Sequence, residues 1–218
     1  MKKPALNALI EQTFETPIGK MLCGLKSNCS EVKFASHRNY ENGNSEMFET
    51  AAHRIELITF KIRQPLYNGG KVTDSQGWIW NIEKTKEIRE NIEIYCHFEQ
   101  TVGQVEFDSA CGENLDAIEI FNNDWTVHIG TEDGEALSER AKNKDDFPSR
   151  LADKVDFYNS ITQMQQKGLF TEVPELEKTE KLYLQYLTAY DKRDTTKINT
   201  WLAVDEFKRK LESWIGIG

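Results

Sequence analysis

The chain has 218 residues, of which 27 are Lys or Arg and 36 are Asp or Glu, and its formal net charge is −9. Its hydrophobic content of 39% is sufficient for a folded core, which excludes a disordered chain. The pI near 5.1 excludes nonspecific partners such as nucleic acid and an anionic membrane surface, because binding to either needs clustered basic residues.

The apolar stretch at the N-terminus is short and interrupted by polar residues, so we expect no signal peptide. No run of about 18 apolar residues occurs anywhere, so no membrane span is expected. Cys23, Cys29, Cys96 and Cys111 are widely scattered in a chain that is long enough to fold without disulfides. We therefore expect a cytoplasmic protein with reduced thiols and with Cys96 buried.

The first sixty residues predict a mixture of helix and strand. Pro4–Phe14 has the spacing of a short amphipathic helix, and weak strands are expected around Met21–Leu25 and Glu31–Ala35. A helix is expected up to about His53. The β-branched and aromatic stretch Ile55–Ile62 then favours a strand.

The middle of the chain predicts strands more clearly, because apolar and polar residues alternate there. Trp78, Trp80 and Ile82 occupy alternate positions, as one face of a strand should, and so do the apolar residues Ile92, Ile94, Cys96 and Phe98. Val105 and Phe107 continue this pattern. Residues 115–121 and 125–129 flank the turn 122–124 and predict a β-hairpin.

From about Phe147 the apolar spacing changes to that of helices. One helix is expected to end at Lys167-Gly168, a second to begin at Pro174, and a third to begin at Asp194 or Thr195. The expected fold class is therefore α+β in a single domain, with a mostly antiparallel sheet over about residues 18–130, an N-terminal helix and three C-terminal helices. The β-rich part covers residues 1–145 and the helical part 146–218, with a soft boundary near 142–147.

The charge is distributed unevenly, because no lysine or arginine lies between Arg89 and Arg140. Residues 78–130 carry three basic and eleven acidic side chains, a charge of −8. The acids of the basic-free stretch, which we call the acidic block, are Glu90, Glu93, Glu99, Glu106, Asp108, Glu113, Asp116, Glu119, Asp124, Glu132, Asp133, Glu135 and Glu139. Such a block favours a negative surface that docks a positive partner, although a solvated sheet face explains it equally well.

The candidate partner-binding residues follow from the predicted strands. Glu93, Glu99, Glu106 and Asp108 occupy polar strand positions and share one side if their strands are neighbours. Like charges that face each other in a sheet are destabilising, so a cluster of acids on one side suggests that it has a function. Docking of a basic protein would supply that function, since complementary potentials speed association.

Two tryptophans complete the candidate set. Trp78 and Trp80 follow the Gly69-Gly70 turn, and tryptophan is enriched at interface hot spots. Core packing is the alternative explanation, because both residues also lie on an apolar strand face.

Motifs for catalysis, cofactors and metals are lacking. The chain contains no phosphate-binding glycine loop, no nucleophile elbow and no zinc or calcium spacing, so we expect no cofactor and no metal. Cys111 and His128 are the least implausible nucleophile and base, and both are better explained as structural residues.

Our first functional hypothesis is a binding protein without catalytic activity that neutralises a basic protein, for example an immunity or inhibitor protein of a nuclease-type toxin. A nuclease channel must be positive in order to hold phosphates, which suits an acidic partner. One alternative is a hydrolase or divalent-metal enzyme whose site is assembled from scattered acids. The other is an adaptor that uses its C-terminal helices. The sequence does not indicate the oligomeric state.

Overall fold

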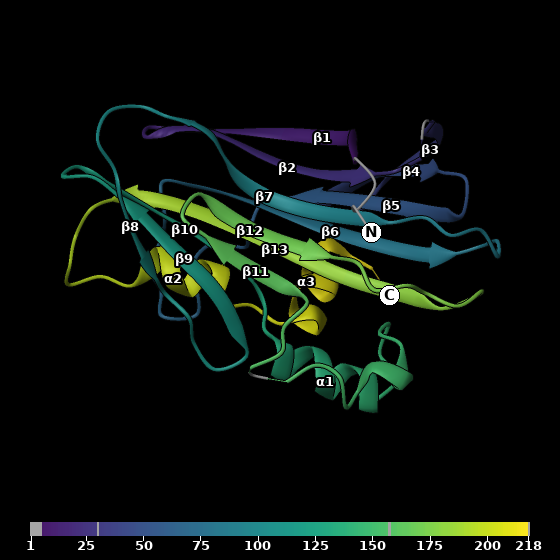
Figure 1. Cartoon of the computed structure of the whole chain (residues 1–218). Helices are drawn as coiled ribbons and strands as arrows, with labels where there is room; N and C mark the ends of the chain where they lie inside the picture. Colours follow the sequence, from purple (N-terminus) through teal and green to yellow (C-terminus); the bar gives the residue numbers. More distant parts are fainter. Residues whose placement is uncertain (1–5, 30, 157, 218) are drawn as a thin grey trace.

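The computed structural model describes residues 6–29, 31–156 and 158–217, and the fold is mostly β with short helices. Two antiparallel sheets make up its frame (Figure 1). Within the described ranges, no helix is long and apolar enough to cross a membrane.

The smaller sheet has five strands. In spatial order they are β1 (Asn7–Thr16), β2 (Gly19–Ser27), β7 (Ile92–Thr101), β12 (Gly168–Glu172) and β11 (Thr162–Gln165). All of its pairings are antiparallel.

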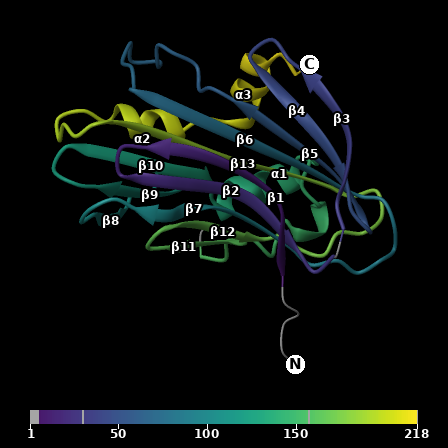
Figure 2. The ribbon, with the colours of Figure 1, turned by 90° about the horizontal axis from the view of Figure 1, so that it is seen from above.

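The larger sheet has eight strands, and its pairings are also all antiparallel. In spatial order they are β3 (Lys33–Asn39), β4 (Gly43–Glu49), β5 (His53–Phe60), β6 (Asp74–Lys84), β13 (Lys181–Lys192), β10 (Trp125–Glu132), β9 (Leu115–Phe121) and β8 (Glu106–Ser109). The two free edge strands, β3 and β8, lie at opposite sides of the molecule (Figure 2).

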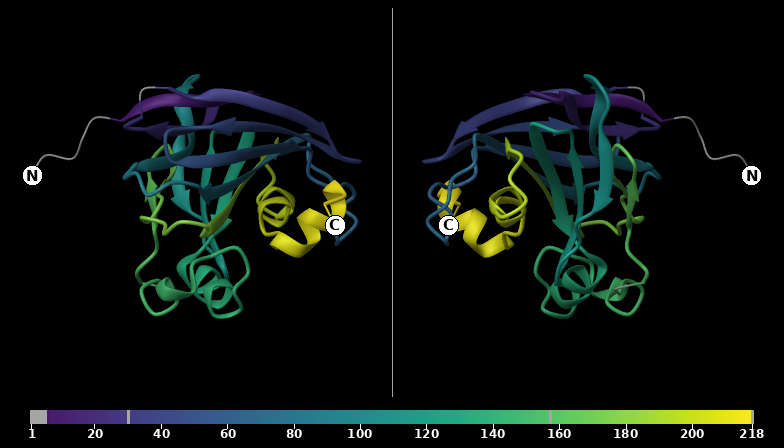
Figure 3. Two further views of the ribbon diagram at one scale, coloured as in Figure 1. Left: turned by 90° about the vertical axis from the view of Figure 1, so that its right-hand side faces the viewer. Right: turned by 90° about the vertical axis from the view of Figure 1, so that its left-hand side faces the viewer.

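Helices are few and short. They are α1 (Gly134–Lys142), the 3-10 turn η1 (Ser149–Leu151), α2 (Asn199–Val204) and α3 (Lys208–Ile215). Figure 3 shows α2 and α3 together beside the larger sheet, with α1 at a separate end of the molecule.

The first core fills the space between the two sheets. Inward positions of β2 and β7, such as Met21 and Phe98, meet inward positions of the larger sheet, such as Trp80 and Leu184. Face-to-face packing of this kind is the arrangement of a β-sandwich. Cys96 lies in this core opposite its cross-strand partner Cys23, which confirms its predicted burial.

The second core covers the opposite face of the larger sheet. Ile58, Ile79 and Leu187 point away from the sandwich and pack with Leu202 of α2 and Leu211 of α3. The larger sheet is therefore buried on both faces at its centre, and the molecule has three layers there.

The expected α+β fold class is wrong, beginning at the N-terminus. The segment that was predicted as a helix is strand β1, paired with β2 along its whole length. Ile10 and Phe14 are buried in the first core while Glu11 and Glu15 are exposed. A β-bulge between Ala8 and Ile10 disturbs the alternation, so the remaining apolar residues resemble a helical stripe.

The predicted helical part 146–218 is wrong for the same kind of reason. It contains β11, β12 and β13, and β13 pairs with β6 and β10 at the centre of the larger sheet. Because both faces of β13 are buried, its residues do not alternate in polarity, and Tyr183, Leu187 and Tyr190 match a helical period by coincidence. The last predicted helix is partly confirmed, as the two short helices α2 and α3.

The middle of the chain agrees better with the predictions. The strands around Trp78, Ile92–Phe98 and Phe107 are confirmed as β6, β7 and β8, and the predicted hairpin is β9–β10. The predicted strands around 21–25 and 55–62 are confirmed as β2 and β5. The helix expected before His53 is wrong, because β4 occupies that position.

Candidate docking edge and ligand cavity

The structure divides the acidic block among several environments. Glu90, Glu132 and Asp133 are buried, and Asp116 is half-buried. Desolvation by burial and the nearby charge of Asp133 raise the pKa of Asp116 to about 6. The block is therefore not a single exposed face.

Glu90 has a structural role between the two sheets. Its Oε1 accepts a hydrogen bond from Ser27 at the end of β2 (2.6 Å), and its Oε2 accepts from Thr50 (2.7 Å) and the Ala52 amide (3.1 Å) in the β4–β5 turn. His53 Nδ1 lies 3.0 Å from the same Oε2. Burial favours the neutral acid, but the hydrogen bonds from His53, Ser27 and Thr50 outweigh it and lower the pKa of Glu90 to about 2.

Glu132 and Asp133 both contact helix α1. Glu132 is ion-paired with Arg140, whose guanidinium also donates to the carbonyl oxygens of Asp145, Asp146 and Tyr183. Burial raises the pKa of Glu132, although the charge of Arg140 opposes the rise. Asp133 accepts a hydrogen bond from the Ala136 amide (2.9 Å) and caps the helix.

The four predicted docking acids do not share one face. Glu93 and Glu99 lie on β7 in the smaller sheet, where Lys26 and Lys20 of β2 form ion pairs with them at 3.2 and 2.9 Å. Their neighbours Ile94 and Phe98 face the first core, so both acids point outward from the smaller sheet. These two acids are already neutralised by lysines that are distant in sequence.

Glu106 and Asp108 lie elsewhere, on edge strand β8 of the larger sheet. Phe107, between them, packs against the first core, so both acids point to the face of the larger sheet that lies away from the sandwich. The predicted four-residue surface is therefore corrected to two separate pairs, one on the outer face of each sheet.

The prediction of tryptophan anchors is also corrected. Trp78 and Trp80 are 1% and 0% exposed, and both belong to the first core. They face the sandwich interior from β6, so neither can contact a partner at the surface. Their apolar strand face was the signal that favoured core packing.

Glu106 and Asp108 are joined by a third acid that the sequence did not single out. Asp108 is the direct cross-strand partner of Glu119 on β9. We call Glu106, Asp108 and Glu119 the acidic edge. Among residues 6–29, 31–156 and 158–217, no lysine or arginine forms an ion pair with any of the three.

One neutral and one basic side chain lie next to the acidic edge. Thr126 on β10 donates a hydrogen bond to Glu119 Oε1 at 2.7 Å. Arg193 lies close by, but its guanidinium stacks 3.9 Å from the centre of the Phe121 ring and donates to the carbonyl oxygen of Asn122. The acidic edge thus retains two acidic residues at directly opposed positions of a strand pair, each with a hydrogen-bond donor but neither with an ion-paired cation in the described residues. Like charges at opposed positions cost stability in a sheet.

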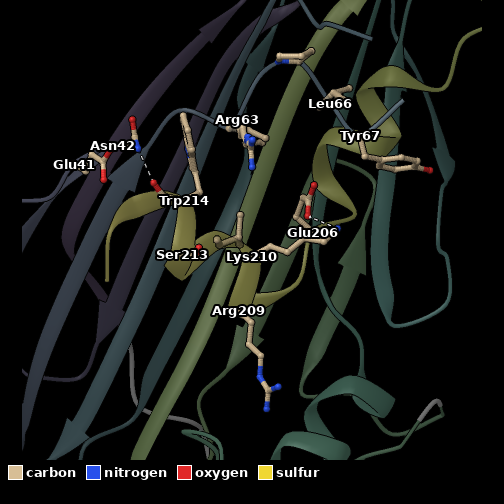
Figure 4. A pocket seen from close by; sticks show the side chains of 13 residues that line it. Glu41, Asn42, Arg63, Leu66, Tyr67, Glu206, Arg209, Lys210, Ser213 and Trp214 are labelled. Carbon is tan, nitrogen blue, oxygen red and sulfur yellow. Dashed lines mark hydrogen bonds and ion pairs between the residues drawn. The ribbon is translucent and has the colours of Figure 1, made fainter. Parts of the chain in front are cut away.

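The structure also contains a cavity of about 770 Å³ beside α3 (Figure 4). Its volume is in the range of small-molecule sites. It is lined by Glu41, Asn42, Ile62, Arg63, Pro65, Leu66, Tyr67, Glu206, Arg209, Lys210, Leu211, Ser213 and Trp214.

The polar groups of this cavity combine cations with an aromatic ring. The guanidinium of Arg63 lies 5.8 Å from the centre of the Trp214 ring, whereas Lys210 is paired with Glu206 at 3.2 Å. Arg209 points away from the other labelled side chains (Figure 4). An arginine beside a tryptophan offers a stacking surface and one positive charge, which suits a flat anion.

The thiol and the imidazole that the sequence offered as nucleophile and base have other partners in the structure. His128 is buried against Thr200 at 3.0 Å, and burial lowers its pKa to about 4. Cys111 Sγ instead lies 3.4 Å from the sulfur of Met164. Within the described ranges, no three His, Cys, Asp or Glu side chains are grouped to hold a metal ion.

Comparison with known protein families, with curated proteins and with solved structures finds no match to this chain. The functional interpretation therefore rests on its own residues.

Proposed function

We propose that the protein is a binding protein whose acidic edge docks a basic surface of another protein. The observation that supports this proposal is the direct opposition of Asp108 and Glu119 on a free sheet edge, with no ion-paired basic side chain in the described residues. Such repulsion lowers the stability of the free protein, and a positive partner relieves it.

The position of β8 strengthens the proposal. β8 is the last strand of the larger sheet, so one side of its backbone has no neighbouring strand within that sheet. Free N–H and C=O groups at an edge can pair with a partner strand, while the carboxylates select a basic one. An immunity or inhibitor protein that covers the positive channel of a nuclease-type toxin would need a surface of this sign.

The test compares two charge reversals of equal size. Glu106→Lys with Asp108→Lys changes the acidic edge, and Glu93→Lys with Glu99→Lys makes the same charge change on the smaller sheet. Wild type and the smaller-sheet variant should recover a basic protein from the native host at low salt, and the β8 variant should not. Added salt should weaken recovery, because exposed charges are screened over about 8 Å at physiological ionic strength.

Equal recovery by all three proteins would contradict the proposal, since docking would not depend on the acidic edge. Circular dichroism of each variant serves as the folding control. The smaller-sheet variant changes the net charge by the same amount as the β8 variant, so its recovery of the partner would show that net charge is not the cause. It also loses two ion pairs with lysines, so its folding control is essential.

A further inference from the structure

The edge strand of the larger sheet opposite β8 is β3, and it is highly exposed to solvent. All seven residues of β3 are exposed, so neither face of this strand is covered. A bulge between Phe34 and Ser36 interrupts its pairing with β4, and the regular part that remains is 36–39. This regular part has four residues, the same length as β8.

The charge of β3 is opposite in sign to that of β8. Lys33 and Arg38 lie on β3, and no carboxylate forms an ion pair with either in the part of the chain that the structure describes. The guanidinium of Arg38 stacks on Tyr40 at 4.8 Å. One sheet therefore has a basic edge and an acidic edge.

These charges also lie on the same face of the sheet. Arg38 is the cross-strand partner of Ser45, and Ser45 is the partner of Ile58, which packs in the second core. Arg38 therefore points away from the sandwich interior, as Glu106 and Asp108 do. Lys33 has the same orientation. The bulge adds one residue between Lys33 and Ser36, so the side chains of Lys33, Ser36 and Arg38 all point to the same side of the strand.

The directions of the two edge strands allow the larger sheets of two copies of the chain to join edge to edge. Eight strands that are antiparallel throughout place β3 and β8 in opposite directions. A second molecule in the same orientation can therefore lay its β8 beside β3, and the sheet remains antiparallel with corresponding faces aligned.

Edge charges normally protect a sheet from pairing with other sheets. Pairing of β3 with β3, or of β8 with β8, would bring like charges together and is blocked in this way. Pairing of β3 with β8 is not blocked, because the two edges carry opposite signs.

We propose that β3 of one copy of this chain pairs with β8 of a second copy, head to tail and antiparallel, with Arg38 beside Glu106 or Asp108. The inference shares the acidic edge with the proposed function, and it names a second copy of this chain, in place of a foreign protein, as the basic partner of that edge. Unlike edges produce a heterologous contact, which extends into a chain of molecules unless it closes into a ring. A contact of four residues per strand implies weak, concentration-dependent association.

The test is a charge swap measured by sedimentation velocity at low salt. One variant carries Lys33→Glu and Arg38→Glu, so that both of its edges are acidic. The other carries Glu106→Lys and Asp108→Lys, so that both of its edges are basic. Wild type should sediment faster as its concentration rises, each variant alone should remain monomeric, and an equimolar mixture of the variants should associate again.

Restoration in the mixture also shows that both variants are folded. Two results would overturn the inference: wild type that stays monomeric at all concentrations, or variants that are folded by circular dichroism but do not associate when mixed. If wild type stays monomeric while a foreign basic protein is still recovered through the acidic edge, the inference fails and the proposed function holds. If no basic partner depends on the acidic edge but the mixture associates, the self-pairing alone stands.

Discussion

At the scale of single residues, the acids of this chain differ most in whether they face the interior or the solvent. Glu90 and Glu93 are three positions apart, yet Glu90 is buried in a network of hydrogen bonds and Glu93 forms a half-exposed ion pair with Lys26. The sequence could not separate them, because the partners of Glu90 are 37 to 63 positions away along the chain.

Glu90 leads to a pH-dependent prediction. Its folded pKa of about 2 lies below the ordinary value of 4.5, so its contribution to stability is full above pH 4.5 and is lost as pH falls toward 2. Glu90→Gln should lower the free energy of unfolding at pH 7 by roughly 2–3 kcal/mol, because buried donors lose their charged acceptor. Urea denaturation at pH 7, 5 and 3 measures the change.

The matched control is Glu93→Gln, which removes only a half-exposed pair and should cost less than about 1 kcal/mol. The difference in stability between Glu90→Gln and wild type should shrink as pH falls from 4.5 toward 2. A difference that is the same at all three pH values would show that the charge of Glu90 does not stabilise the fold.

At the scale of elements, one close contact between neighbouring strands can be tested directly. Gly77 on β6 is the cross-strand partner of Phe60 on β5, and a Cβ atom at Gly77 would overlap the Phe60 ring. Phe60 is 3% exposed and belongs to the second core, so its ring can give way only by displacing buried neighbours. Gly77→Ala should therefore lower the free energy of unfolding by about 1–3 kcal/mol through overpacking.

A double-mutant cycle identifies the cause of this loss. In a Phe60→Leu background the ring is absent, so Gly77→Ala should cost clearly less than it does in wild type. Denaturant unfolding of the four proteins gives the coupling energy. Equal costs in both backgrounds would assign the effect of Gly77→Ala to the strand backbone instead of the ring.

Strands with a visible alternation of side chains, or beside a clear turn, were the elements that the sequence predicted well. β6 and β10 were among them although both of their faces are largely buried. β7 alternates apolar and polar side chains because only one of its faces meets the first core. β13 is buried on both faces, and β1 carries a bulge, so their apolar residues do not have a period of two. The sequence did not predict helix α1, because its apolar stripe is short. The capping residue Asp133 before Gly134 was the signal that could have indicated it.

At the scale of the whole molecule, the formal charge of −9 does not produce one negative face. Lys20 and Lys26 come from β2, far from the acidic block in sequence, and neutralise its acids on the smaller sheet. The basic-free run could be read from the sequence, whereas its division among two sheets and the interior follows from strand order. Strand order depends on long-range pairing, which local patterns do not determine.

The central place of β13 determines when the protein can fold during synthesis. Among the strands of the described residues, β13 comes last in the sequence, yet it lies between β6 and β10 and joins the two halves of the larger sheet. Until it emerges from the ribosome, β6 and β10 present long apolar edges without a partner. A chain that ends at Lys178 should therefore be recovered mainly as aggregate, and a soluble, cooperatively folded fragment would contradict this. Synthesis of Lys181–Lys192 therefore closes the larger sheet, and until then the unpaired edges of β6 and β10 are the surfaces that a chaperone would cover.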